Sequence, residues 1–486
     1  MQKPSSAPRT RRPGSPFNVW KNLSSIFYGS RSSSPPPTFQ LITALTPDQE
    51  AKIETLTNYL LEYVGVRPEY HQVQTLLGQN NWELKEATEE IKDLLDADEG
   101  LLVPFDNRRI MLGAENDEYT SCYIDSLLFA MFIPFSTFEP LLLSTPAVST
   151  FVKPLDARRL QTSIRLFVNR LRSGKLVTTR IVRQLREDLA CCGWKGRDPR
   201  SRAFTQEDTS ELFLFLTELL ELPYLPFQIR LFHGANADND DDRLMTERML
   251  TLSIPTPDAA SPKSPISLES ILVEHFYNNM VTGIKRQVAI QASGARTAKE
   301  KERAASGDDI SEKVPFLDSE NPALSVDPAL SSSSASASVS SSSTTAEVAV
   351  SAWQVLELLP FYSGINEQGD YVHQHTREFP DRRMILPLVL KRYAYDNYGQ
   401  ASRIQRDVFI PHEINISNFV SKDDGREVCE VCGNPLRYVM ELRSVVCHKG
   451  DSPNAGHYVA YCSVPGENDE GSWLKLGECD TFLFCI

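Results

Sequence analysis

One cysteine stands where the start of a helix could turn it into a nucleophile. Cys122 follows Thr120 and Ser121, which are candidate N-cap residues, and precedes the apolar run 127–132. These residues predict a buried helix that begins at about Cys122. The helix dipole and the free backbone N–H groups at such a start favour thiolate over thiol. Cys122 is therefore a candidate nucleophile, and the alternative interpretation is a small buried core residue.

A histidine far along the chain could supply the base that such a thiol needs. His457 opens the strand-like segment 456–461, which reads Gly-His-Tyr-Val-Ala-Tyr. In a cysteine hydrolase, a histidine takes the thiol proton and later gives it to the leaving amine, while a third polar group orients the ring. A lone histidine at the start of a strand is more often a surface or structurally satisfied residue. Cys122 and His457 together predict a cysteine hydrolase if the fold brings them close.

Four segments resemble the sequence boxes of the ubiquitin-specific protease family, in the same order. The family's cysteine box reads T-C-Y-x-N-S-x-L, and this chain has Ser-Cys-Tyr-Ile-Asp-Ser-Leu-Leu. Asp125, where most members have Asn, resembles the cylindromatosis-type branch, as does the one-sided cysteine pair described below. The boxes lie at 121–128 (cysteine box), 206–213 (acidic box, Q-Q-D-x-x-E-F in the family), 390–393 with 409–411 (strand box, L-K-R-F and F-P) and 448–461 (histidine box, H-x-G and G-H-Y-x-A-Y).

The resemblance implies an α+β fold with a papain-like core of thumb, palm and fingers. It implies a deubiquitinase, in which Cys122 and His457 hydrolyse the isopeptide or peptide bond at the C-terminal glycine of ubiquitin. The basic tail of ubiquitin would lie in a cleft between the helical and sheet halves. There Asp208 and Glu211 would pair with a tail arginine, as bidentate carboxylate contacts allow. The positions that the resemblance assigns to substrate binding are Gln206, Asp208, Glu211, His448 and Tyr458.

Two positions depart from the family pattern. Many members have an Asn five residues before the cysteine to help hold the oxyanion, but here Asp117 stands there and Asn116 one residue earlier. The position of the third catalytic residue aligns with Gly477, followed by Glu478 and Asp480. Asp480 is the candidate for that role. The alternatives are Glu478, a truncated or mistranslated C-terminus, or an enzyme that works slowly with Cys and His alone.

A second cysteine motif could bind a metal. Cys429 and Cys432 are two residues apart, which is the spacing of half a zinc knuckle. A tetrahedral zinc site needs four ligands, and the chain has no second pair at this spacing, although Cys447 or His448 could complete the site. A reduced, metal-free pair is the alternative. No cofactor is required for the predicted chemistry, and a structural zinc ion is an option.

Composition divides the chain into four parts. Residues 1–44 are rich in Ser, Pro and Arg and predict a disordered arm. Residues 45–98 have helical periodicity, and the segment 76–95, LLGQNNWELKEATEEIKDLL, resembles the end of a UBA-type three-helix bundle, a family that binds ubiquitin, although a plain helical packing element fits equally well. The catalytic domain is expected at 105–486, with a disordered Ser-rich insert at about 285–350. Helix patterns before the insert and strand patterns after it indicate an α+β domain with an antiparallel sheet.

Charge and apolar content restrict the partners. A net charge of -14 argues against a nucleic-acid binder, and no apolar run is long enough to cross a membrane. The N-terminus has no signal-peptide pattern, so we expect a cytoplasmic and/or nuclear protein whose nine cysteines are reduced. Ubiquitin and ubiquitinated proteins are the expected partners. The main rival function is a catalytically weak or inactive ubiquitin-binding scaffold of the same fold, which the unusual acid position favours.

Overall fold

The structure, a computed structural model, describes the chain in stretches from residue 45 onward. The predicted arm at 1–44, the middle of the insert at 289–343, the cysteine pair Cys429 and Cys432, and the end at 477–486 lie outside the described residues. The described residues are 45–106, 108–134, 137–143, 152–220, 227–232, 243–246, 248–255, 264–277, 279–288, 344–358, 363–365, 371–373, 385–395, 398–420, 437–452, 455–464 and 472–476.

Helices occupy the first part of the described chain, as the sequence periodicity predicts. Most of the segment between residues 45 and 98 is helical, and a long helix starts at Pro154, a residue that is common at the first helical position. The helices are α2 (Pro47–Tyr59), the π-helical turn η1 (Leu60–Val64), α3 (Tyr70–Gln79), α4 (Leu84–Asp98), the 3₁₀ turn η2 (Asp117–Tyr119), α5 (Cys122–Phe132), α6 (Pro140–Leu143), α7 (Pro154–Arg172), α8 (Thr179–Cys191), α9 (Thr209–Leu219) and α10 (Leu268–Tyr277).

Strands dominate the later part of the chain. The sheet that matters for the site is antiparallel, with the strand order β15-β16-β17. The strands are β1 (Phe227–Phe232), β2 (Arg243–Thr246), β3 (Leu250–Ser253), β4 (Ile266–Ser267), β5 (Asn279–Val288), β6 (Thr344–Leu358), β7 (Ser363–Ile365), β8 (Tyr371–His373), β9 (Leu388–Lys391), β10 (Tyr393–Tyr395), β11 (Ala401–Arg403), β12 (Val408–Phe409), β13 (Glu413–Asn415), β14 (Val439–Glu441), β15 (Ser444–Ser452), β16 (Ala455–Val464) and β17 (Ser472–Leu476).

Besides the antiparallel sheet that the sequence predicts, two described strand pairs are parallel. β3 pairs with β9, and β4 pairs with β12, in parallel register. In each pair one strand precedes the insert and the other follows it. A parallel pair needs a long crossover connection, and the intervening chain supplies one. The long connection therefore decided that these strands run parallel. The alternation of residues within a strand does not show the path of such a connection, so the sequence pattern could not predict the direction.

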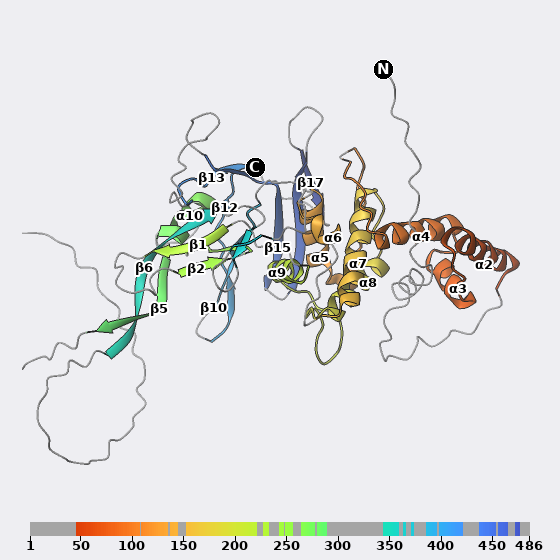
Figure 1. The fold of residues 1–486 in the computed structure, drawn as a ribbon, viewed down its shortest axis with the longest axis horizontal. Helices are drawn as coiled ribbons and strands as arrows, with labels where there is room; N and C mark the ends of the chain where they lie inside the picture. Colours follow the sequence, from red (N-terminus) through yellow and green to blue (C-terminus); the bar gives the residue numbers. More distant parts are fainter. Residues whose placement is uncertain are drawn as a thin grey trace, which may run out of the picture. The chain divides into compact units, whose positions relative to one another are not determined.

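The helix that begins at Cys122 lies at the centre of the core. All eleven residues of α5 are buried. A helix without a polar face must be covered on every side, and α5 packs against β16 and β15, α9 and α7 (Figure 1). Phe129 and Phe132 are among the largest fully buried side chains. The cysteine at the start of this helix is consequently held by several elements that are far apart in sequence.

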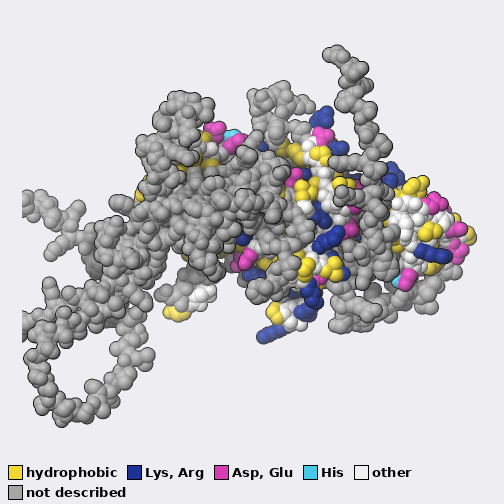
Figure 2. Space-filling view, in the orientation of Figure 1, with side chains coloured by type: hydrophobic (Ala, Val, Ile, Leu, Met, Phe, Trp, Pro, Cys, Tyr) yellow, Lys and Arg dark blue, Asp and Glu magenta, His cyan; other side chains and the backbone are white. Residues whose placement is uncertain are grey.

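Helices α2 to α4 form a small bundle, which we call the N-terminal bundle, and α4 packs against α7. The segment 45–99 contains thirteen acidic and four basic residues, whereas 154–191 contains nine basic and three acidic residues. The two segments therefore attract each other. Figure 2 shows acidic side chains on the N-terminal bundle and Lys and Arg side chains over α7 and α8. The bundle is joined to the catalytic part by charge as well as by apolar packing.

Contacts divide the chain into two compact units, one of residues 1–279 with 352–486 and a smaller one of residues 280–351. The smaller unit holds most of β5 and the first part of β6, and the predicted insert falls within it. The candidate site lies wholly in the larger unit. Helices and strands both contribute to the fold, which confirms the α+β class. Among the described helices, none is both long and apolar enough to cross a membrane.

Candidate active site

The Cys122 sulfur atom receives contacts from two distant parts of the chain. Cys122 is the first residue of α5, and its side chain is only 4% exposed. The Tyr458 backbone N–H on β16 donates to Cys122 Sγ at 3.4 Å. Cys122 Sγ in turn lies 3.6 Å from Gln206 Oε1, to which the thiol donates. The cysteine, acidic and histidine boxes therefore meet at one sulfur atom.

The thiol pKa reflects a competition between burial and backbone donors. The backbone N–H groups of Tyr458, Cys122 and Tyr123 lower the pKa of the Cys122 thiol, as expected at a helix start. Burial is the larger effect, and it raises the pKa of the Cys122 thiol above its ordinary value. The helix start alone therefore does not make a thiolate, so the site needs a base.

The predicted base lies on the strand that touches the sulfur. His457 is the residue before Tyr458 on β16 and is the register partner of Lys449 on β15. Gly456 precedes it at φ 147°, a conformation that side chains rarely adopt. A Cβ at Gly456 would also collide with the Lys449 carbonyl oxygen and His448 Nε2. The glycine is thus required for β15 and β16 to approach closely beside His457.

A second histidine belongs to an aromatic cluster on the same sheet. His448 and Tyr458 are register partners, and their ring centroids are 4.7 Å apart. His448 Nδ1 lies 3.3 Å from the hydroxyl of Tyr393, which donates to the Gly450 carbonyl at 3.1 Å. Burial, followed by the nearby charge of Arg403, lowers the pKa of His448. His448 therefore favours the neutral form, which suits a residue that lines a binding surface.

The acidic box lies at the start of α9. Asp208 is the N-cap residue, and its Oδ1 accepts from the backbone N–H groups of Ser210 at 2.7 Å and Glu211 at 3.2 Å. Glu211 is exposed and forms an ion pair with Lys195, which also lies 3.7 Å from Glu207. Asp208 thus stabilises the helix start, and its second carboxylate oxygen accepts no hydrogen bond among the described residues.

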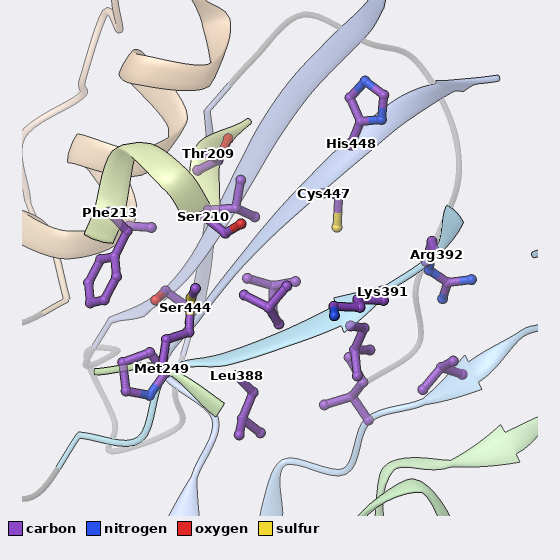
Figure 3. Close-up of a pocket in the computed structure, with 18 of the residues that line it drawn as sticks. Thr209, Ser210, Phe213, Met249, Leu388, Lys391, Arg392, Ser444, Cys447 and His448 are labelled. Carbon is purple, nitrogen blue, oxygen red and sulfur yellow. The ribbon is translucent and has the colours of Figure 1, made fainter. Parts of the chain in front are cut away.

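A cavity of about 1640 Å³ is lined by residues of the acidic box and of the histidine box. Thr209, Ser210 and Phe213 on α9 line one side, and Cys447 and His448 on β15 line another (Figure 3). The predicted substrate-binding residues Gln206, Asp208, Glu211, His448 and Tyr458 all contribute to its wall. The structure therefore gathers the five positions that the family resemblance assigned to substrate binding.

The residue at the family's oxyanion position is committed to a buried ion cluster. Asp117 is 1% exposed, and its carboxylate accepts from Arg183 Nη2 at 2.7 Å and Arg186 Nη1 at 3.2 Å. Arg186 also donates to Thr120 Oγ1 at 2.7 Å and to the Thr205 carbonyl at 3.2 Å. Arg186 consequently joins the loop before Cys122 to the loop before Gln206. Sequence reasoning missed Arg186, because its partners lie in two segments that are separate from α8 in the sequence.

The Ser121 hydroxyl does not cap α5, contrary to the N-cap prediction. Ser121 makes no side-chain capping bond, and its Oγ accepts from the Asp117 backbone N–H at 2.9 Å. The Ser121 backbone N–H donates to Asn116 Oδ1 at 2.9 Å. The loop 116–121 is instead folded back on itself, which places Glu118 and Tyr119 at positive φ.

Two predicted groups lie outside the described residues. Asp480, Glu478 and Gly477 follow β17, whose last residue, Leu476, pairs with Ala460 on β16. β17 runs toward the His457 end of β16, but the third catalytic residue stays a prediction. Cys429 and Cys432 are also outside the described part. Within the part that is described, no three His, Cys, Asp or Glu side chains gather to hold a metal ion.

Comparison with known proteins decides the family. The sequence model of the ubiquitin carboxyl-terminal hydrolase family matches residues 112–478, a range that includes all four boxes. The chain belongs to that family. The ubiquitin carboxyl-terminal hydrolases are cysteine-type hydrolases with a papain-like core, so the family and the fold that the boxes predict are confirmed. The cylindromatosis-type branch and the UBA-type assignment remain predictions.

Individual relatives are distant. Ubiquitin carboxyl-terminal hydrolase 44 of Danio rerio is 27% identical over 106 residues, which are 21% of this chain and 14% of that protein. Among solved structures, the yeast SAGA DUB module with a mutant Sgf73 has a TM-score of 0.41 at 15% identity, over 80% of this chain and 69% of that chain. The Ubp8/Sgf11/Sus1/Sgf73 DUB module bound to ubiquitin aldehyde has a TM-score of 0.40 at 15% identity, over 81% and 70%.

Proposed function

We propose that this ubiquitin carboxyl-terminal hydrolase is an active deubiquitinase that cleaves the bond after the C-terminal glycine of ubiquitin. One observation carries the proposal. Cys122 Sγ contacts the Tyr458 backbone N–H at 3.4 Å and Gln206 Oε1 at 3.6 Å. The sulfur of the candidate nucleophile is therefore in contact with the strand of the candidate base and with the acidic box. Such a convergence is what nucleophilic catalysis by cysteine requires.

His457 supplies the base in this proposal. Burial raises the pKa of Cys122, so the thiol ionises only when a neighbouring group takes its proton. The imidazole of His457 receives that proton, and the sulfur attacks the carbonyl carbon of the ubiquitin glycine. The protonated imidazole then gives its proton to the leaving amine, and water hydrolyses the thioester. Asp480, or else Glu478, is proposed to orient the ring.

The acidic box is proposed to receive the basic tail of ubiquitin. Asp208, Glu207 and Glu211 form an acidic edge of the cavity wall. Glu211 forms an ion pair with Lys195, and both side chains are exposed to solvent. An arginine of the ubiquitin tail could therefore compete with Lys195 for Glu211. The rest of the cavity wall combines apolar side chains with cationic ones such as Lys391, Arg392 and Arg403, so the acidic edge is the part that suits a basic tail.

A ubiquitin probe with a C-terminal electrophile tests the proposal. The native chain should form a covalent adduct and hydrolyse a ubiquitin C-terminal amide. Cys122→Ala should do neither while still binding ubiquitin, and His457→Ala should lose nearly all turnover. The matched control is Cys191→Ala, because Cys191 is exposed and lies outside the site. A native chain that binds ubiquitin but never reacts would be a scaffold, and turnover by Cys122→Ala would exclude the mechanism.

A further inference from the structure

The attack on a carbonyl creates an oxyanion, and this chain lacks the usual side-chain donor for it. A carboxylate at Asp117 can only accept hydrogen bonds, and both of its oxygens already accept from arginines, Oδ1 from Arg183 at 2.7 Å and Oδ2 from Arg186 at 3.2 Å. Asn116 directs its amide oxygen to the Ser121 backbone N–H at 2.9 Å. Asp117, which stands at the family's position, therefore cannot offer the amide donor that many members of the family use there.

Gln206 has a buried donor beside the nucleophile. Its Oε1 lies 3.6 Å from Cys122 Sγ, and Nε2 is bonded to the same carbon atom as Oε1. Nε2 is inaccessible to solvent and has no hydrogen-bond partner among the described residues. A buried amide N–H without an acceptor is unfavourable, and most such groups in folded proteins are satisfied. An acceptor that forms during the reaction would give Gln206 Nε2 the hydrogen bond that it lacks.

The backbone around Gln206 is fixed before any substrate binds. The Thr205 backbone N–H donates to the Gly196 carbonyl at 3.2 Å, and Thr205 Oγ1 donates to Glu207 at 2.7 Å. Arg186 holds the Thr205 carbonyl and Thr120 Oγ1 at the same time. Residues on both sides of the Cys122 to Gln206 contact are therefore tied to one guanidinium group. Such preorganisation is what makes an oxyanion donor effective, because no reorganisation is needed during the reaction.

We propose that Gln206 is a catalytic residue whose Nε2 donates to the oxyanion, in the role that Asn has in many relatives. The inference rests on the deubiquitinase function proposed above. As the bond between Cys122 Sγ and the carbonyl carbon forms, the C=O π electrons move to the oxygen, which accepts from Gln206 Nε2 and from the Cys122 backbone N–H. When the oxygen re-forms the double bond, the C–N bond breaks and the amine leaves with the proton from His457.

Two ubiquitin reagents separate this role from simple binding or thiol activation. A C-terminal amide substrate reacts through an oxyanion, whereas a C-terminal bromoethylamide probe alkylates the thiol by displacement and forms none. In Gln206→Met, kcat for the amide should fall about 10²- to 10³-fold with little change in KM. Alkylation by the bromoethylamide probe should stay within about twofold of the native rate, because thiolate formation does not use Nε2. Gln79→Met, an exposed glutamine on α3, is the matched control.

The outcomes are distinguishable. Native-like kcat in Gln206→Met overturns the proposal. An equal loss with both reagents also overturns it, because Gln206 would then act on the thiol or on ubiquitin binding. The probe reaction itself reports a folded site, and Gln206→Ala provides a second variant if the methionine disturbs the loop. If the native chain reacts with neither reagent, the deubiquitinase function fails, and the role of Gln206 falls with it.

Discussion

At the scale of single residues, the hydrogen bonds around the Ser121 hydroxyl favour a protonated Asp125. Ser121 Oγ lies 3.1 Å from Asp125 Oδ2 and 3.3 Å from Asn116 Oδ1, and it also accepts from the Asp117 backbone N–H. One hydroxyl proton cannot serve two acceptors. A protonated Asp125 resolves the conflict, because it donates to Ser121 and leaves the serine proton for Asn116. Burial raises the pKa of Asp125 to about 8, in agreement with this network.

Asp125→Asn should therefore change how stability depends on pH. Burial raises the Asp125 pKa from 3.8 to about 8, so the folded chain keeps a proton that the unfolded chain loses between these values. The free energy of unfolding should fall as pH rises across that window, by at most about 1.4 kcal/mol per pH unit from this group. Asn cannot ionise and can still donate to Ser121. Urea unfolding from pH 5 to 8 should show a shallower decline in Asp125→Asn.

The exposed Asp48→Asn is the control for the pH series, because its carboxylate lies on the surface of α2. In Asp48→Asn the free energy of unfolding should change with pH as steeply as it does in the native chain. Identical slopes in native chain and Asp125→Asn would mean that Asp125 is ionised in the folded state.

At the scale of elements, the position of the cysteine depends on how α5 is held at its far end. The Phe132 carbonyl, at the last turn of α5, accepts from Arg172 Nε at 3.2 Å and Nη2 at 2.6 Å. Arg172 Nη1 donates to the Val103 carbonyl at 2.9 Å and pairs with Glu139 at 2.8 Å. A cation at a helix C-terminus also complements the helix dipole. Arg172 thus fixes α5 against α7, α6 and the segment that follows the N-terminal bundle.

Arg172→Met should destabilise the folded chain strongly. The arginine side chain is 2% exposed, so its removal leaves carbonyl groups without donors and Glu139 without its cation. Breaking one partner of a buried pair typically costs about 3–5 kcal/mol. Urea unfolding measures the loss, and the exposed Arg158→Met on the same helix should change little. Equal stability of the two variants would show that Arg172 does not hold α5.

At the scale of the whole molecule, the N-terminal bundle behaves as a part of the catalytic body. Asp93 on α4 accepts from Arg170 at 2.9 Å and from Lys175 at 2.8 Å, and Arg165 donates to the Ala97 carbonyl. These contacts occupy the α7-facing side of α4 and favour the interpretation of residues 45–98 as a packing element. A ubiquitin-binding role for the bundle would have to use another face.

Asp93→Ala should weaken the docking of the bundle. The Asp93 side chain is 16% exposed and serves two cations, so its loss should lower the free energy of unfolding by about 1–3 kcal/mol. Protection of α4 amides from hydrogen exchange should fall with it, because the bundle would detach more often. Asp48→Ala, which removes an exposed pair on the outer helix α2, is the control and should leave both measurements nearly unchanged. A bundle that keeps its protection in Asp93→Ala would be held by apolar contacts alone.

The sequence alone determined the family and the α+β class, and it predicts the nucleophile and the base. These depend on local signals, namely short boxes around Cys122 and His457, helical periodicity before the insert and strand-like runs after it. The box residues are informative because catalysis requires particular side chains, and the sequence states the side chain at every position. The start of a helix, such as that of α5, can also be predicted from the residues next to it.

Only the tertiary structure decided which groups surround the Cys122 sulfur. The contacts of Arg186 with Asp117, Thr120 and Thr205 join three segments, and the unpartnered Nε2 of Gln206 becomes visible only once α9 and α5 are placed. The net rise of the Cys122 pKa has the same origin, because burial is a property of the packed core and outweighs the helix start. Long-range packing has no local period, so these features could not be predicted from residue spacing.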